Sequence, residues 1–438
     1  MKFIERKILA NLDAWEKKPG RKPLILRGAR QVGKTAAVRE FAARRGLDLA
    51  ECNFERQPKL KACFSDSLAP RDILKELELI IGQQVRGERT LLFFDEIQEA
   101  PRAITSLRYF FEEAPSLRVI AAGSLLEFVL GQYSVPVGRI HYEYMYPLCF
   151  SEFLQATSRE QLVEFMPKLV DLRFEGSSRI AAEELRHALK EYFIIGGMPE
   201  AVAQFAYEKS LAGVARVHDD VLQAFRDDIR KYARGDNQIE NVGTIFSRIF
   251  GFCGQQIAYT KLGDGDDIKR TKKSIQLLEQ AMLLHRVLPT QATQPLASSA
   301  KDRPFKCAFL DIGLGRFAAG LSSQDVYTSK NLGAAHSGAA AEQFVGQQLL
   351  SESSAASEGR KLFYWQRGEK GSSAEIDYLL ARDGKVIPVE VKSGKSGTLR
   401  SLHAFIDRNP TEFGICLQDI ASPRREGKII FAPLYTIL

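Results

Sequence analysis

The sequence lacks a long apolar run, and this absence excludes the helical kind of membrane protein. None of its 438 residues lies in a stretch that approaches the roughly 20 apolar residues of a membrane-spanning helix. The N-terminus also lacks the pattern of a signal peptide. Phe3, Ile4, Ile8, Leu12 and Trp15 instead recur at the spacing of one helix face, with charges between them. We therefore expect a chain with no membrane partner.

Cysteine is scarce and scattered. The six cysteines, at positions 52, 63, 149, 253, 307 and 416, never form C-x-x-C. This distribution argues against a disulfide framework or a zinc site, and it favours a reducing compartment. The sequence thus predicts a cytoplasmic protein.

A strong excess of one charge is absent too. The net charge is +7 and the isoelectric point is near 8.9, but the charges are spread over the whole chain. Such a balance permits a nucleic-acid partner without requiring one. The composition, 45% hydrophobic and 26% charged, is ordinary for a globular protein, and the length predicts about three domains of roughly 150 residues each.

The most informative stretch that is present follows a predicted strand at residues 24–26. Residues 28–35 match G-x-x-x-x-G-K-[ST], and residues 36–45 read as a helix. This order places loop N–H groups and a helix N-terminus around phosphate oxygens, whereas a chance match would not need the flanking strand and helix. Lys34 is expected to reach the β- and γ-phosphates and Thr35 to hold Mg²⁺. The predicted ATP-binding residues are Gly28, Ala29, Arg30, Gln31, Val32, Gly33, Lys34 and Thr35.

A second motif, at residues 90–98, has four apolar residues followed by two acids. It predicts a buried parallel strand whose carboxyl end meets the nucleotide. There Asp95 would hold Mg²⁺ and Glu96 would polarise the attacking water. The alternative is an ordinary acidic turn. It is less favoured because a P-loop lies upstream and the two motifs are parts of one site. Further strands at 48–53 and 117–122, with helices at 71–84 and 101–113, predict a parallel sheet covered on both faces.

Four segments together resemble a known family. They are GARQVGKT, LLFFDEIQ, VIAAGSLLEF and VGRIHYEYMYPLCFSEFL, and they are similar to bacterial and archaeal AAA ATPases whose C-terminal half is named only as a domain of unknown function. The resemblance implies that Ser124 monitors the γ-phosphate. It also makes Arg139 a candidate for stabilising the transition state, with a plain surface arginine as the alternative. The G-G-M-P-E segment at 196–200 looks like part of the same family, and we expect its role to be structural.

Helical patterns fill residues 147–235, and residues 236–300 resemble a winged helix. This resemblance rests on a helix at 242–253, a second helix at 267–284 and a strand-like run at 283–288. Lys269, Arg270, Lys272 and Lys273 begin the second helix and would suit DNA phosphates. The segment is only weakly basic, so a lid or an oligomer contact is the alternative.

The C-terminal part contains a second set of charged residues. Asp377 lies on one predicted strand, and Glu390 and Lys392 lie on the next, 13 residues along, after a hairpin turn at Gly384. This is the D-x(n)-E-x-K arrangement of the PD-(D/E)xK nuclease fold, to which Glu342 on a preceding helix would add an acid. In that reading Asp377 and Glu390 ligate a divalent metal and Lys392 activates water for phosphodiester attack. The alternative is a nuclease-like fold that does not cleave, with Glu390 and Lys392 paired.

The predicted architecture is α/β: a P-loop NTPase parallel sheet, a helical connector with a winged helix, and a PD-(D/E)xK nuclease-like α/β domain. The expected boundaries are 1–146, 147–235, 236–300 and 301–438. Three functions remain open: an ATPase with a nuclease-like domain acting on DNA, an ATP-driven switch whose C-terminal fold only binds a partner, and a regulator that binds DNA through the winged helix. ATP and Mg²⁺ are the expected cofactors, and a homo-oligomer is compatible with the family.

Overall fold

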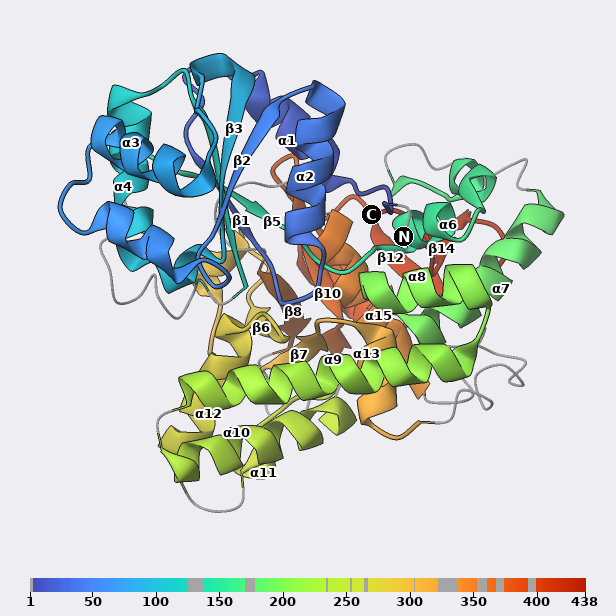
Figure 1. Cartoon of the computed structure of the whole chain (residues 1–438). Coiled ribbons are helices and arrows are strands. Elements are labelled where there is room, and N and C mark those ends of the chain that lie inside the picture. The colour runs from blue at the N-terminus through green and yellow to red at the C-terminus, as the bar shows by residue number, and fades with distance from the viewer. Residues whose placement is uncertain are drawn as a thin grey trace. The chain divides into compact units, whose positions relative to one another are not determined.

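The computed structural model describes residues 3–124, 126, 138–169, 178–233, 235–252, 254–263, 267–302, 304–321, 337–352, 361–367, 374–392 and 399–438 (Figure 1). Its contacts divide into two compact units. The first centres on Met1–Tyr146, and the second is built from Pro147–Glu279, Leu283–Ser354 and Arg360–Leu438. No helix within the described ranges is both long enough and apolar enough to cross a bilayer.

The first unit is organised around one parallel sheet with the strand order β2-β3-β4-β1-β5. Strands β1 and β4 are neighbours, and the chain runs from β1 toward β2 on one side and from β4 to β5 on the other. Ligands bind at the carboxyl ends of strands at such a point. The strands are β1 (Leu24–Arg27), β2 (Asp48–Asn53), β3 (Thr90–Asp95), β4 (Arg118–Gly123) and β5 (His141–Tyr144).

Helices cover both faces of this sheet, which explains why its central strands β1, β3 and β4 are apolar on both sides. Figure 1 shows α1 and α2 on one side and α3 and α4 on the other. Alternate strand residues, including Ile25 and Phe94, pack with α3 and α4, while Trp15 and Phe41 join α1 to α2. The helices are α1 (Ile8–Glu16), α2 (Lys34–Arg45), α3 (Pro70–Ile81) and α4 (Pro101–Glu113), with 3-10 turns η1 (Pro58–Phe64), η2 (Gly87–Arg89) and η3 (Ile97–Glu99).

The second unit combines a set of helices with two sheets. Its helices are α6 (Phe150–Ala156), α7 (Arg179–Ile195), α8 (Pro199–Glu208), α9 (Leu211–Tyr232), α10 (Asp236–Ile249), α11 (Tyr259–Leu262), α12 (Ile268–Gln280), α13 (Ile312–Ala318), α15 (Ser337–Glu352) and α16 (Arg400–Arg408). Its 3-10 turns are η4 (Glu160–Phe165), η6 (Phe250–Phe252) and η7 (Leu296–Ser299). Its strands are β6 (Leu284–Thr290), β7 (Lys306–Phe309), β8 (Leu362–Gln366), β9 (Glu375–Ile376), β10 (Tyr378–Arg382), β11 (Lys385–Val391), β12 (Gly414–Gln418), β13 (Arg424–Glu426) and β14 (Ile429–Pro433).

One residue marks the point where the chain passes between these two sheets. The four-stranded sheet has the order β7-β6-β8-β9, and the five-stranded sheet has the order β10-β11-β12-β14-β13. Ile376 pairs with β8 of the first, and Tyr378 pairs with β11 of the second. Asp377 therefore lies at the junction of the two sheets.

Helices α10, α11 and α12 are followed by the antiparallel pair β6 and β7. Strand β6 also pairs in parallel with β8, so this ribbon continues into the four-stranded sheet. On α12, Thr271, Ser274, Ile275 and Leu278 form the buried stripe. The opposite side of α12 faces solvent.

Most predicted elements of the described chain form close to their expected places. The helix expected at 242–253 is α10, which begins and ends earlier, at Asp236 and Ile249. After β7, Asp311 caps α13, because its Oδ1 accepts a hydrogen bond of 2.9 Å from the Leu314 N–H.

The paired glycines of the G-G-M-P-E segment make a close approach that only glycine permits. Gly196 has φ +73°, and a Cβ on it would lie 1.9 Å from Asp311 Oδ1. A Cβ on Gly197 would lie 2.1 Å from the backbone oxygen of Leu148, while the Gly197 N–H donates to Asp311 Oδ2 at 2.6 Å. The segment joins α7 and α8 to residues far away in the sequence.

We expect Gly197→Ala to destabilise the second unit by about 2–3 kcal/mol, because the added methyl group meets backbone rather than a movable side chain. Gly243→Ala is the matched control: Gly243 lies in α10 with open space around it, so alanine should stabilise that helix by up to about 1 kcal/mol. Urea unfolding of both variants measures the two shifts. Equal urea midpoints for Gly197→Ala and Gly243→Ala would contradict the close approach of Gly197 to Leu148.

Candidate functional site

The loop between β1 and α2 has the backbone of a tight phosphate-binding turn. Gln31 and Gly33 both have positive φ, +64° and +96°. A Cβ on Gly28 would lie 2.3 Å from the backbone oxygen of Met145, so glycine is required there as well. The loop opens directly into α2 at Lys34, which brings a helix N-terminus to the turn.

Lys34 is buried inside this loop. Its Nζ donates to the backbone oxygens of Gly28 and Ala29 at 2.9 and 2.8 Å. Burial lowers the pKa of Lys34 from 10.5 to about 8, although the carboxylates of Glu96 and Asp95 oppose that shift. The ammonium is thus held among neutral carbonyls, with no carboxylate at hydrogen-bonding distance in the described part of the chain, and an anionic phosphate would complement it.

The first acid of the second motif contacts the loop directly. Thr35 Oγ1 donates to both carboxylate oxygens of Asp95 at 3.1 Å, and Asn53 Nδ2 donates to Asp95 Oδ2 at 2.9 Å. Burial, and then the neighbouring Glu96, raise the pKa of Asp95. A hydroxyl and a carboxylate held together at a phosphate loop are the oxygen ligands that Mg²⁺ prefers, so the residues fit this ion.

The second acid is oriented by two polar neighbours. Glu96 has φ +50°, and its Oε2 accepts hydrogen bonds from Gln98 Nε2 at 2.6 Å and from Ser124 Oγ at 3.5 Å. Gly123 permits this crowding, because a Cβ there would lie 2.2 Å from Gln98 Oε1. Glu96 and Ser124 therefore meet at the carboxyl ends of β3 and β4, as the sequence suggested.

Arg139 lies elsewhere on the same unit. Its Nε donates to Glu112 at the end of α4, at 3.0 Å, and its side chain is 43% exposed. Arg139 precedes β5, and β5 runs parallel to β1 in the register Leu24 to His141. It therefore lies at the amino edge of the sheet, while the phosphate loop follows the carboxyl edge. The geometry does not bring Arg139 to the loop of its own chain.

The charged residues of the C-terminal part do come together, around a lysine that the sequence did not single out. Lys306 on β7 is 1% exposed, and its Nζ lies 2.8 Å from Glu342 Oε1 and 3.3 Å from Asp377 Oδ1. It also forms an ion pair with Glu375. Three carboxylates from α15, β9 and the bend before β10 thus surround one ammonium group.

The remaining two members pair with each other. Lys392 Nζ donates to Glu390 Oε1 at 2.6 Å, and Asp377 Oδ2 accepts from the Val391 N–H at 2.8 Å. Glu390 is buried, and its Oε2 has no hydrogen-bond partner among the described residues. The predicted set is therefore assembled, but each of its carboxyl groups already has a partner within the chain.

The pKa values in this cluster follow from burial and crowding. Burial and then Asp377 raise the pKa of Glu342 to about 8 and that of Glu390 to about 7, with Lys306 and Lys392 opposing. Burial would lower the pKa of Lys306, but Glu342, Asp377 and Glu375 together raise it above its ordinary value. Lys306 therefore stays charged at neutral pH.

This arrangement does not fit the divalent metal that a nuclease reading implies. Lys306 Nζ already lies where the oxygens of Glu342 and Asp377 converge. Within the described ranges, the structure holds no group of three or more His, Cys, Asp or Glu side chains arranged to bind a metal ion.

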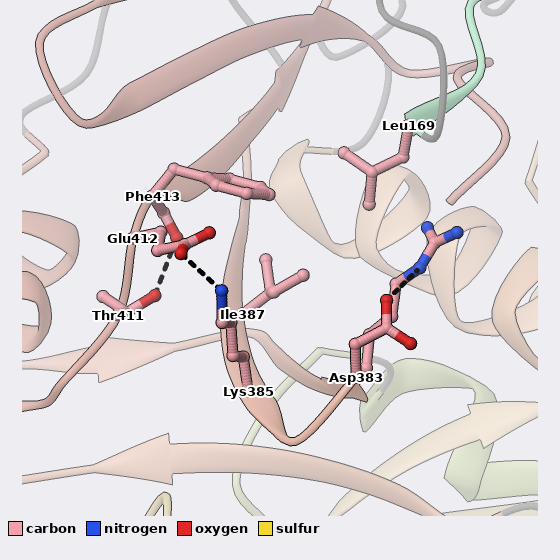
Figure 2. Close-up of a pocket in the computed structure, with 8 residues that line it drawn as sticks. Leu169, Asp383, Lys385, Ile387, Thr411, Glu412 and Phe413 are labelled. Carbon is pink, nitrogen blue, oxygen red and sulfur yellow. Dashed lines mark hydrogen bonds and ion pairs between the residues drawn. The ribbon is translucent and has the colours of Figure 1, made fainter.

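A cavity of about 280 Å³ lies elsewhere in the second unit, at the β10–β11 hairpin (Figure 2). Its charges are internally paired: Lys385 with Glu412, and Arg382 with Asp383 at 3.8 Å. None of the residues predicted to act as a site lines it. The full lining is Leu169, Arg382, Asp383, Lys385, Ile387, Thr411, Glu412 and Phe413.

Comparison with known families agrees with the geometry of the first unit. Residues 20–154 match the family described as AAA domain. The chain carries an AAA-type ATPase domain. The match covers less than a third of the chain, so it identifies this domain and not the rest. Residues 186–325 match a domain of unknown function (DUF8612), and residues 337–437 match another (DUF4143).

Known proteins and solved structures add little beyond this. No curated protein matches the chain. The Walker-type ATPase PABY2304 of Pyrococcus abyssi is 15% identical with a TM-score of 0.44, over 72% of this chain and 96% of that one. The ORC1 protein of Aeropyrum pernix, solved in complex with DNA, is 11% identical with a TM-score of 0.27, over 72% and 90%. Both TM-scores lie below 0.5, so neither likeness supports a conclusion about this chain.

Four residues at these sites were not predicted as site residues. Asn53 could have been found, because it ends a predicted strand that pairs with β3 in the register Asn53 to Asp95. Gln98 lies within the second motif itself. Glu375 is two residues before Asp377, but Lys306 carries no local signal, because only the folding of β7 beside α15 brings it to the acids.

Proposed function

We propose that this protein binds ATP with Mg²⁺ and hydrolyses it. The observation that carries the proposal is the contact of Thr35 with both oxygens of Asp95 at 3.1 Å. It joins the phosphate loop to the acids at the end of β3, two features that have no reason to meet unless they serve one ligand. The match of residues 20–154 to an AAA domain supports the same reading.

Each residue then has a distinct task. The buried ammonium of Lys34, which donates to the backbone oxygens of Gly28 and Ala29, binds the β- and γ-phosphates. Glu96 accepts a proton from the attacking water, and Ser124 and Gln98 hold its carboxylate in place. Thr35 and Asp95 would hold Mg²⁺, which supplies neutralisation of the phosphate charge.

Arg139 contributes from a second copy of the chain in this proposal. It is half-exposed and lies at the edge of the sheet opposite its own phosphate loop. An arginine so placed can reach a nucleotide only across a contact between two chains, which makes a homo-oligomer part of the proposal. The scattered free thiols, including the buried Cys52 and Cys416, support a cytoplasmic location.

Hydrolysis is tested with Glu96→Gln. We expect ATP affinity to change by less than about threefold and turnover to fall by about 10²–10⁴-fold, because the amide cannot accept the proton. Glu99→Gln is the matched control on the same turn, since Glu99 pairs with Lys61 at 3.1 Å and has no contact to the loop. Phosphate release is measured with Mg²⁺, with and without DNA. A wild-type chain that releases no phosphate under any of these conditions would refute hydrolysis.

We further propose that α12 contacts DNA. Lys269 and Lys273 are exposed and lie four residues apart, so they project from one side of the helix, with Lys272 half-buried beside them. Arg270 instead donates to the backbone oxygen of Asn237. Three lysines beside a β-ribbon suit the phosphates of a duplex better than its base edges, so binding should depend little on sequence.

The test replaces Lys269 and Lys273 together by glutamine. If both contact phosphates, the slope of log affinity against log salt concentration falls by about 2 for a mixed-sequence duplex. The control pair, Arg179→Gln with Lys428→Gln, removes the same charge from exposed positions elsewhere in the second unit. Equal losses of affinity in both pairs would mean that α12 has no specific part in binding.

For the C-terminal part we propose a nuclease-like fold, and the contacts favour the version that does not cleave. The ion pair between Glu390 and Lys392 at 2.6 Å is what a non-cleaving relative would have, and Lys306 holds the other acids. The protein would then be an ATP-driven switch whose C-terminal part binds a partner. The competing version, in which Asp377, Glu390 and Lys392 cut DNA, requires a metal at the same acids.

A further inference from the structure

Lys306 is an unusual residue to find at the centre of a fold. Lysine is almost never fully buried unless it is paired, because taking an ammonium group out of water costs several kcal/mol in a typical protein. Lys306 is 1% exposed, with the ring of Tyr364 5.5 Å from its Nζ. The chain offsets this cost by placing three carboxylates around it.

These carboxylates come from separate elements and converge on one point. Glu342 projects from α15, Glu375 from β9, and Asp377 from the junction between the two sheets. Nothing in a purely structural ion pair requires three acids for one lysine. Carboxylate oxygens are also the ligand type that a small divalent cation takes, at about 2.0–2.2 Å, but here Lys306 Nζ lies where the oxygens converge.

Residues from the segment before α11 also pack on the cluster. Gln256 donates to the second oxygen of Glu375, and a Cβ on Gly254 would lie 2.8 Å from Glu342 Oε2. Residues just before α11 therefore pack directly on the acids. The remaining acid, Glu390, has its own cation in Lys392. Two lysines thus serve four carboxylates, and both come from the chain itself.

We infer that Lys306 is a built-in cation that takes the place of the divalent metal, so the cluster of Glu342, Glu375 and Asp377 binds no metal and cleaves no phosphodiester. This inference rests on the nuclease-like reading of the second unit, but not on ATP hydrolysis by the first. An ammonium at 2.8–3.3 Å from these oxygens and a metal ion cannot share the position. Removing the ammonium should convert the cluster into a metal site.

The test is Lys306→Met, which keeps most of the length of the side chain and removes its charge. Without nucleotide, we expect the wild-type chain to bind no Mn²⁺ here and its unfolding temperature to be the same in Mn²⁺ and in chelator. The variant should lose stability in chelator, because three acids then lack a counterion. It should regain stability in Mn²⁺ and bind this ion at least about tenfold more tightly than the wild type. Electron paramagnetic resonance of free Mn²⁺ counts the bound ion.

Two further variants keep the test decisive. Lys361→Met, at an exposed lysine next to β8, should gain no Mn²⁺ binding. If Lys306→Met does not fold, Lys306→Met with Glu342→Gln and Glu375→Gln should fold without metal, since it removes two of the three acids together with the lysine and leaves Asp377 bonded to the Val391 N–H. Failure of that variant as well would overturn the charge argument.

Other results would overturn the inference while leaving the ATPase proposal intact. Stoichiometric Mn²⁺ binding by the wild type without nucleotide would show that lysine does not exclude the ion. A folded Lys306→Met chain that gains no Mn²⁺ would show that the acids are not a ligand set. Cleavage of DNA by the wild type that Asp377→Ala abolishes would place a working metal in the cluster.

Discussion

The contact between Thr35 and Asp95 is the constraint on which the first unit depends. It joins residues sixty positions apart, and it forms only if β1 and β3 run parallel on either side of β4, so that their carboxyl ends meet at one edge. The same pairing brings Asn53 from β2 and Ser124 from β4 to that edge. A single sheet therefore positions the phosphate loop and both acids of the site.

Two buried lysines show how differently one residue type can be used. Lys34 lies among backbone carbonyls, and burial lowers its pKa to about 8. Lys306 is buried as deeply but lies among carboxylates, and its pKa is raised. The first is a buried charge among neutral carbonyls, which an anionic phosphate would complement. The second is a charge already neutralised by its own fold, which is the condition of a structural cation.

The sequence allowed the first of these lysines to be predicted and not the second. Lys34, Asp95 and Glu96 belong to motifs in which spacing along the chain determines position in space, because a strand, a loop and a helix follow one another directly. Lys306 reaches Glu342 and Asp377 only through the pairing of β7 with β6 and the packing of α15, so no local pattern marks it. Likewise no local pattern marks the long-range role of Asp311, whose carboxylate caps α13 at the Leu314 N–H and also accepts from the distant Gly197 N–H.

We propose that the phosphate-loop site takes its cation from solution with the nucleotide, whereas the acid cluster of the second unit uses Lys306 as its cation. Counting Mn²⁺ bound per chain, with and without a non-hydrolysable ATP analogue, tests this most directly. The account predicts no bound ion without the analogue and one with it, and the bound ion should be lost in Thr35→Ala. An ion bound without nucleotide, or two ions with it, would contradict the account.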